Sequence, residues 1–216
     1  MFHVKHNKDV IKVDPEVLAS ARELYQINES DYEKYIDLLL EWNEKINVIS
    51  RTVSRETVRE HVIHSLLPVP LNLLAGYKKW LDTGTGGGLP GIPIAINQPD
   101  LNIVLNDNIK KKMMVVDDIV QSMGLQNTEI LDYSVSLIDL NRGTGILSKH
   151  AFKISKLIHL LGDKPWEVIV MWKGVNDALE EIKQHKKKLD YTIYSFDFGD
   201  DEPFYEGKGL VLIERS

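Results

Sequence analysis

A glycine-rich stretch, residues 82–91, carries the residue types best suited to binding a ligand. It reads Asp-Thr-Gly-Thr-Gly-Gly-Gly-Leu-Pro-Gly and lies between the apolar pair Trp80-Leu81 and the apolar residues 92–96. This pattern predicts a strand, a glycine turn and a helix. Glycines tolerate positive φ and leave space beside the backbone, and the free N–H groups of a helix N-terminus favour negative charge. The stretch therefore predicts a site for an anionic or nucleotide-like ligand.

Two cofactor classes use a loop of this kind, and the spacing permits both. Gly86, Gly88 and Gly91 satisfy the G-x-G-x-x-G spacing of dinucleotide-binding folds. An acid at the strand end followed by alternating glycines, as in Asp82 and Gly84 onward, is instead typical of an S-adenosylmethionine site. A carboxylate is unfavourable beside a pyrophosphate and favourable beside the cationic methionine end of that cofactor. A surface loop without a ligand is the third interpretation.

The continuation Gly-Leu-Pro-Gly-Ile-Pro, residues 88–93, is more particular than the glycines alone. Together, residues 82–96 resemble the cofactor loop of the RsmG (GidB) family. Members of that family are bacterial 16S ribosomal RNA methyltransferases that modify guanine N7, with guanine 527 as the family target. The resemblance extends from about residue 32 to residue 211. It implies S-adenosylmethionine as cofactor and 16S rRNA, or the small ribosomal subunit, as partner.

The resemblance also implies roles for single residues. Asp82 lies near the amino group of the cofactor, above a cradle formed by Gly84, Gly86, Gly88 and Leu89. Asn106 or Asp107 meets the ribose. The residues implied to surround the adenosine are Val135 and Ser136. Two lysines, Lys149 and Lys173, are implied to face the substrate, and Lys149 is implied to contact the cofactor as well. No catalytic residue is implied beyond these, because catalysis would depend on positioning the substrate and the cofactor. The Lys110-Lys111 pair matches a basic pair of the family.

Three positions depart from the family pattern. Asn106 stands where the family has the ribose-binding acid, so that either Asp107 substitutes through a small register change or ribose binding is weaker. Ser136 stands where an acid is frequent. Lys149 replaces an arginine and keeps its charge without the guanidinium fork. These departures leave open a catalytically weakened RNA- or ribosome-binding relative.

The pattern along the chain predicts an α/β protein of the Rossmann-like, class I S-adenosylmethionine-dependent methyltransferase fold. Residues 1–75 are expected to form a helical region after an unstructured start to about Val13. The first helix is expected to be capped by Asp14, the second to begin with a capping box at Ser30, and the third to span residues 54–67. Residues 76–216 are expected to form the cofactor-binding core. It has a mostly parallel sheet of seven strands, with helices on both faces and the last two strands antiparallel at one edge.

Bulk properties exclude several classes. The 216 residues contain no cysteine, which excludes disulfides and thiol nucleophiles. The sequence shows no signal-peptide pattern and no apolar run of membrane-spanning length, so a cytoplasmic protein is expected. His61 and His64 share a helix face, but no further ligands have suitable spacing, so no metal site is expected. The net charge of -6 means that any RNA affinity requires local basic patches, of which residues 183–188 are one. We expect a monomer.

The sequence shows no nucleophile motif, and transfer of a methyl group to guanine N7 requires none, because N7 carries a lone pair and no proton. The competing hypothesis of an NAD-type oxidoreductase lacks hydride-transfer residues. It also does not account for about seventy residues before the first core strand.

The gene offers a separate hypothesis. The first six residues can be encoded by ATGTTTCACGTGAAACAT, which is its own reverse complement, and residues 53–57 can be encoded around the same palindromic core. This core resembles the chromosome-partitioning sites found within and near genes of this family. Codons that break the palindrome at both places would end the idea.

Overall fold

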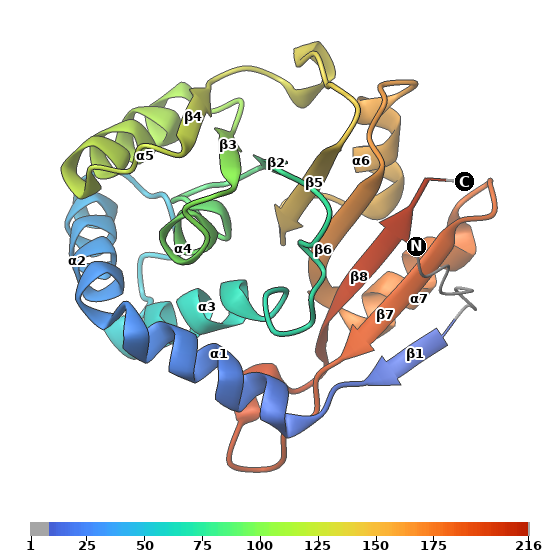
Figure 1. Cartoon of the computed structure of the whole chain (residues 1–216), viewed down its shortest axis with the longest axis horizontal. Coiled ribbons are helices and arrows are strands. Elements are labelled where there is room, and N and C mark those ends of the chain that lie inside the picture. Colours follow the sequence, from blue (N-terminus) through green and yellow to red (C-terminus); the bar gives the residue numbers. More distant parts are fainter. Residues whose placement is uncertain (1–8, 216) are drawn as a thin grey trace.

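The computed structural model describes residues 9–215, so the first six residues lie outside the described part of the chain. One mixed sheet crosses the molecule in the order β1-β7-β8-β6-β5-β2-β3-β4 (Figure 1). Only β8 runs antiparallel to its neighbours. The strands are β1 (Asp9–Lys12), β2 (Lys79–Thr83), β3 (Asn102–Asn106), β4 (Thr128–Leu131), β5 (Thr144–Lys149), β6 (Val168–Gly174), β7 (Asp190–Ser195) and β8 (Lys208–Glu214).

The sheet has eight strands within the described residues, so the expected number of seven was wrong. The additional strand is β1, which lies in the segment expected to be unstructured and pairs in parallel with β7, Asp9 opposite Thr192. The antiparallel pair formed by the last two strands is confirmed. However, neither strand is at the edge of the sheet, because β8 lies between β6 and β7 and β1 pairs with the outer side of β7.

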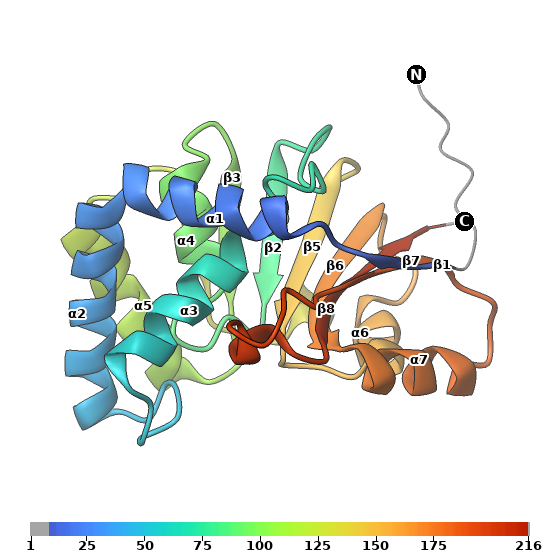
Figure 2. The ribbon, with the colours of Figure 1, turned by 90° about the horizontal axis from the view of Figure 1, so that it is seen from below.

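Helices cover both faces, as predicted. They are α1 (Pro15–Ile27), α2 (Glu29–Lys45), α3 (Arg55–Leu66), α4 (Gly91–Asn97), α5 (Lys110–Met123), α6 (Ile154–Leu161) and α7 (Val175–Gln184). Residues that alternate along the strands point to opposite faces. Trp80, Ile103 and Leu147 therefore pack with the first five helices, whereas Leu81 and Ile146 pack with α6 and α7 (Figure 2).

The local signals for helix starts gave mixed results. Asp14 caps α1 by accepting a hydrogen bond from the Glu16 N–H at 2.9 Å, and Ser54 caps α3 in the same way through Thr57. The predicted Ser30 capping box was wrong. Helix α2 already begins at Glu29, with Asn28 as its N-cap and no side-chain capping bond.

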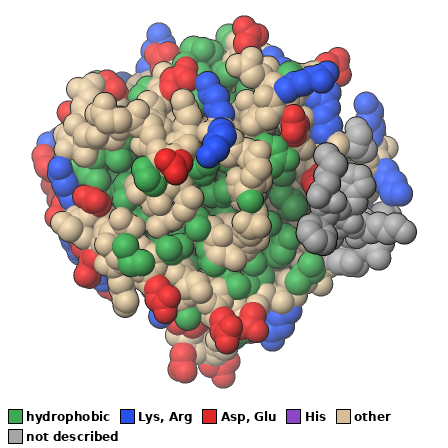
Figure 3. All heavy atoms as spheres, in the orientation of Figure 1, with side chains coloured by type: hydrophobic (Ala, Val, Ile, Leu, Met, Phe, Trp, Pro, Cys, Tyr) green, Lys and Arg blue, Asp and Glu red, His purple; other side chains and the backbone are tan. Residues whose placement is uncertain are grey.

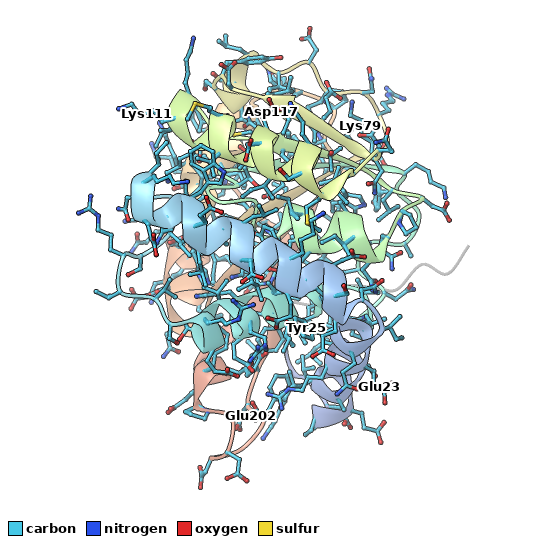
Figure 4. All side chains as sticks on the ribbon, turned by 90° about the vertical axis from the view of Figure 1, so that its left-hand side faces the viewer. Glu23, Tyr25, Lys79, Lys111, Asp117 and Glu202 are labelled. Carbon is cyan, nitrogen blue, oxygen red and sulfur yellow. The ribbon has the colours of Figure 1, made fainter. Side chains whose placement is uncertain are left out.

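The N-terminal helices are fastened at both ends of the sheet. Figure 4 shows α2 beside α5, and Trp42 Nε1 donates to Asp118 at 2.7 Å across that interface. At the other end, Arg22 pairs at 2.7 Å with Glu202 in the acidic connection between β7 and β8. Acidic side chains gather over this connection at the lower edge of Figure 3. The helices α1 to α3 therefore span one face of the core.

Candidate active site

The loop between β2 and α4 follows the predicted strand, turn and helix. Gly84, Gly86 and Gly88 have φ of 73°, 59° and 100°, a region that side chains with a Cβ rarely occupy. A Cβ on Gly84 would lie 2.3 Å from the Cβ of Ala151, so the loop packs directly on the segment after β5. A Cβ on Gly86 would meet only the Val48 carbonyl oxygen, at 3.6 Å, so the backbone is open there.

Asp82 joins the two ends of this loop from beneath. Its Oδ2 accepts hydrogen bonds from Thr85 Oγ1 at 2.6 Å and from the Gly91 N–H at 2.9 Å, at the start of α4. Its Oδ1 is buried and has no partner within the described residues. Burial raises the pKa of Asp82 to about 7. The sequence predicted this carboxylate near the amino group of the cofactor, and an unpartnered carboxylate oxygen is suited to a cationic neighbour. Asp82 itself does not line the ligand cleft.

The end of β3 decides between Asn106 and Asp107. Asn106 uses its whole side chain within the fold: Oδ1 accepts from Thr83 Oγ1 at 3.0 Å, and Nδ2 donates to the carbonyls of Leu131 and Tyr133 at 2.9 and 2.7 Å. Asp107 instead faces the glycine loop, with Oδ2 3.4 Å from the Gly86 N–H. Of these two residues, Asp107 is the one that lines the cleft.

A cleft of about 610 Å³ opens at the carboxyl ends of β2, β3 and β5. This is the edge of an open α/β sheet where ligands bind. Its walls come from four parts of the chain: residues 48–58 with His61, the glycine loop, residues 107–112, and residues 149–152. Asn43 shapes the first wall, because its Oδ1 accepts from the Val48 and Ile49 N–H groups at 3.0 Å each and its Nδ2 donates to the Ser50 carbonyl.

Lys149 and His61 form a buried pair on the wall of this cleft. Lys149 is 8 % exposed, and its Nζ lies 2.8 Å from Nδ1 of His61. Burial, followed by the repulsion of Lys208, lowers the pKa of Lys149 to about 7. Burial and the charge of Lys149 lower the pKa of His61 to about 3, so the ring is neutral, and Nδ1 accepts the hydrogen bond when Lys149 is an ammonium. In the described residues, no carboxylate lies within ion-pair distance of Lys149.

Two further histidines lie beside this pair. His64 is fully buried among the rings of Phe196, Phe204 and Tyr205, and burial lowers its pKa well below the usual value. His150 lines the cleft with φ of 55°, and burial lowers its pKa to about 4. A positive φ in a non-glycine residue is a strained conformation of the kind that gathers at functional sites.

Several residues singled out by the sequence lie elsewhere. Val135 is buried in the short 3₁₀ turn η1 (Val135–Leu137), Ser136 is exposed in that turn, and neither lines the cleft. Lys173 does not line the cleft either, and its predicted contact with the substrate stays a prediction. Its ammonium pairs with Glu181 at 3.0 Å and donates to the Phe152 carbonyl at 3.2 Å, which braces the segment after β5.

The basic pair at the start of α5 is also displaced from the cleft. Lys110 and Lys111 are exposed, Lys111 at the outer end of the helix in Figure 4, and the following Lys112 lines the cleft. The sequence interpretation did not assign a role to Lys112, His150, Ala151 or Phe152. The last three directly follow a predicted parallel strand, which was the signal available for them.

The residues present fit an S-adenosylmethionine molecule. The open backbone at Gly86, the unpartnered Asp82 oxygen and a carboxylate at the end of β3 match a cationic amino acid end and a ribose. No group of three metal-ligating side chains occurs among residues 9–215. In the same part of the chain, no helix is long and apolar enough to cross a bilayer. The sheet, its glycine loop and this cleft define a class I methyltransferase.

Solved structures of methyltransferases share this fold. The 23S rRNA methyltransferase ErmE matches with a TM-score of 0.52 at 10% identity, covering 76% of this chain and 69% of that one. A putative O-methyltransferase from Klebsiella pneumoniae matches with a TM-score of 0.51 at 16% identity, covering 83% and 89%. At these identities the likeness concerns the fold alone.

Sequence relatives identify the family. The model of the GidB family, rRNA small subunit methyltransferase G, matches residues 28–195. Ribosomal RNA small subunit methyltransferase G of Chlorobium limicola is 32% identical over 206 residues, covering 90% of this chain and 93% of the relative. That of Flavobacterium psychrophilum is 32% identical, covering 92% and 96%. The chain therefore belongs to the GidB family of S-adenosylmethionine-dependent rRNA small subunit methyltransferases. The predicted family is confirmed, and the oxidoreductase hypothesis is set aside.

Proposed function

We propose that the chain transfers a methyl group to N7 of a specific guanine in 16S rRNA, with the small ribosomal subunit as its partner. The observation that carries the proposal is the single cleft in which the glycine loop, Asp107 and the Lys149–His61 pair face one another. One carboxylate, Asp107, lines this cleft within the described residues, and both of its oxygens already accept backbone hydrogen bonds. Guanine N7 has no proton to lose, so its methylation requires no general base from this cleft.

The cofactor supplies an electrophilic methyl group on a sulfonium. With the cofactor held in this cleft, the lone pair of N7 would form the new carbon–nitrogen bond as the methyl–sulfur bond broke, and that bond's electron pair would stay on sulfur. No proton would move, and the positive charge would pass from sulfur to the guanine ring. The chain contributes proximity and orientation, which can supply several kcal/mol of the barrier without a general base.

Individual residues have distinct tasks in this proposal. Gly84, Gly86 and Gly88, with Leu89, hold the methionine part of the cofactor, and the buried charge of Asp82 favours its ammonium group from below. Asp107 binds the ribose in place of Asn106, whose side chain is already engaged. Val135 and Ser136 are better placed to shape the β4–β5 connection than to touch the cofactor directly.

The proposal has a two-stage test. Calorimetric titration with S-adenosylmethionine, using NAD as control ligand, is expected to show binding of the first alone. Small subunits from a strain lacking this gene are then incubated with the protein and cofactor. Borohydride reduction and aniline treatment cleave RNA at N7-methylguanine and give one new stop in primer extension. Cofactor binding without this stop would support the weakened relative instead.

The proposal also includes a monomeric, cytoplasmic protein without a resident metal. The large hydrophobic side chains exposed in the described residues are distributed over separate elements, including Val10 on β1, Ile27 on α1 and Leu179 on α7. Such scattered residues do not form a continuous interface. Sedimentation equilibrium at micromolar concentration is expected to give the monomer mass of 24.7 kDa.

A further inference from the structure

Lys149 is the buried group of the cleft that has hydrogen-bond donors to spare. An amine carries two N–H groups and an ammonium three, yet the side chain has one partner in the described residues, Nδ1 of His61 at 2.8 Å. The residue is 8 % exposed and lines the cleft, so a ligand bound there can reach the remaining donors. An unsatisfied buried donor on the wall of a binding cleft indicates an acceptor atom supplied by the ligand.

The position of Lys149 places this donor beside the reacting centre. Lys149 ends β5, two residues past Leu147, which pairs in register with Asp82 on β2. The glycine loop follows Asp82 and packs through Gly84 on Ala151, two residues past Lys149. The donor and the loop that would hold the methyl donor therefore belong to the same end of two adjacent strands.

The chemistry of guanine identifies the matching acceptor. Guanine presents two acceptors on its major-groove edge, N7 and O6. If N7 receives the methyl group, its lone pair is used and O6 remains. We propose that Lys149 donates a hydrogen bond to O6 of the target guanine, and that His61 is a positioning residue that orients Lys149 for this contact. The inference rests on the proposed function and names the atom by which the base is selected.

The residue types fit this task. A lysine is a single-point donor, so Lys149 can meet O6 while N7 stays free to receive the methyl group. Adenine presents an amino donor where guanine has O6, so Lys149 would oppose it donor to donor.

His61 is built to hold this amine. Its ring packs edge-on against Phe204 with centroids 5.0 Å apart, which fixes its plane. The neutral ring presents Nδ1 as an acceptor, so one N–H of Lys149 is directed to His61 and the others are directed elsewhere. A histidine in this role acts through Lys149 and does not itself need to contact the reacting atoms.

The test changes one atom of the substrate. Small subunits are reconstituted with 16S rRNA assembled by splinted ligation, carrying guanine or 2-aminopurine at the methylated position; 2-aminopurine retains N7 and lacks O6. Affinity is measured in the presence of S-adenosylhomocysteine, and the rate of methyl transfer is measured in single turnover. For the wild type, we expect the affinity or the rate of methyl transfer to be about tenfold lower with 2-aminopurine than with guanine, which is the equivalent of one hydrogen bond.

Variants then locate the partner of O6. Lys149→Met is expected to abolish the difference between the two bases, and the surface control Lys156→Met is expected to retain it. His61→Phe keeps the packing on Phe204 without an acceptor and is expected to reduce the difference. His61→Asn restores an oxygen near the Nδ1 position and is expected to recover it. Melting temperature and cofactor affinity verify that each variant is folded.

The outcomes separate this inference from the proposed function. Absence of N7 methylation on guanine by the wild type would refute the proposed function, and the inference with it. If methylation is normal and Lys149→Met prefers guanine over 2-aminopurine as strongly as the wild type does, the inference alone is overturned. Failure of His61→Asn to recover what His61→Phe loses would overturn the role of His61.

Discussion

Replacing Asp82 by Asn should change the pH dependence of stability by a predictable amount. The Asp82 carboxyl is fully buried, and burial raises its pKa from 3.8 to about 7. In the unfolded chain it ionises near its usual pKa, so above pH 7 the folded protein pays the full cost of a buried charge. The cost falls as the pH decreases, because the folded carboxyl takes up a proton that the unfolded chain does not. Asparagine, which does not titrate, removes this contribution.

The magnitude follows from the difference in pKa. Each unit corresponds to about 1.4 kcal/mol, so the pH-dependent cost is about 4 kcal/mol above pH 7 and close to zero near pH 4. The difference in unfolding free energy between Asp82→Asn and wild type should therefore fall by about 3 kcal/mol from pH 8 to pH 5. Urea unfolding of both proteins without cofactor measures it. The histidines with lowered pKa lose stability with acid in both proteins and cancel in the difference.

The difference in unfolding free energy should also contain a part that does not depend on pH, because the asparagine amide cannot replace the carboxylate equally well as the partner of Thr85 and Gly91. This constant part does not alter how the difference changes with pH. A difference independent of pH would refute the reasoning, because it would mean that Asp82 titrates alike in the folded and unfolded chain. The same carboxyl should release a proton when the cationic cofactor binds below pH 7. Calorimetry in two buffers of different ionisation enthalpy would detect that release in the wild type and its loss in Asp82→Asn.

Three further perturbations test the architecture of the site. Gly84→Ala places a Cβ 2.3 Å from the Cβ of Ala151, so it should lower the free energy of unfolding by about 3 kcal/mol and weaken cofactor binding. Gly86→Ala adds its Cβ in open space and should lower the free energy of unfolding by only about 1 kcal/mol. Thermal unfolding and cofactor titration measure both variants. Lys173→Met should destabilise by about 1–3 kcal/mol in urea, because the partly buried Glu181 loses its ion-pair partner while it keeps the hydrogen bond from the Ile154 N–H. Glu181→Gln in the same chain should restore part of the loss. Asn106→Asp sets an acceptor against two carbonyl oxygens and should cost about 2–4 kcal/mol in urea without improving cofactor affinity; tighter binding would show instead that position 106 meets the ribose.

Much of the fold could be predicted because its signals are local. The buried strands are apolar runs, Gly124 ends α5 with φ of 69° as its position suggested, and the glycine loop marks the edge of the sheet. Strand β1 could not be found in this way, since four residues with two charges have no strand pattern of their own and their partner lies about 180 residues later. Helix α6 was not predicted, although residues 154–161 carry a helical period.

The candidate site was less predictable than the fold. Alternation along β3 sends Asn106 and Asp107 in different directions, and a one-residue ambiguity in the sequence could not decide which of them faces the cleft. The pairing of Lys173 with Glu181 depends on how α7 returns across the sheet, and that of Lys149 with His61 joins residues 88 positions apart. Contacts of this kind exist only after the chain has folded.

The pairing of β1 with β7 bears on how the protein is made. The N-terminal strand leaves the ribosome first, but it has no partner until residues 190–195 have been synthesised, near the end of the chain. Arg22 of α1 likewise waits for Glu202. Strand β1 therefore stays unpaired until β7 has been synthesised, whereas α1 can pack on α2 and α3 earlier. Folding then completes in a late step that joins the beginning of the chain to its end.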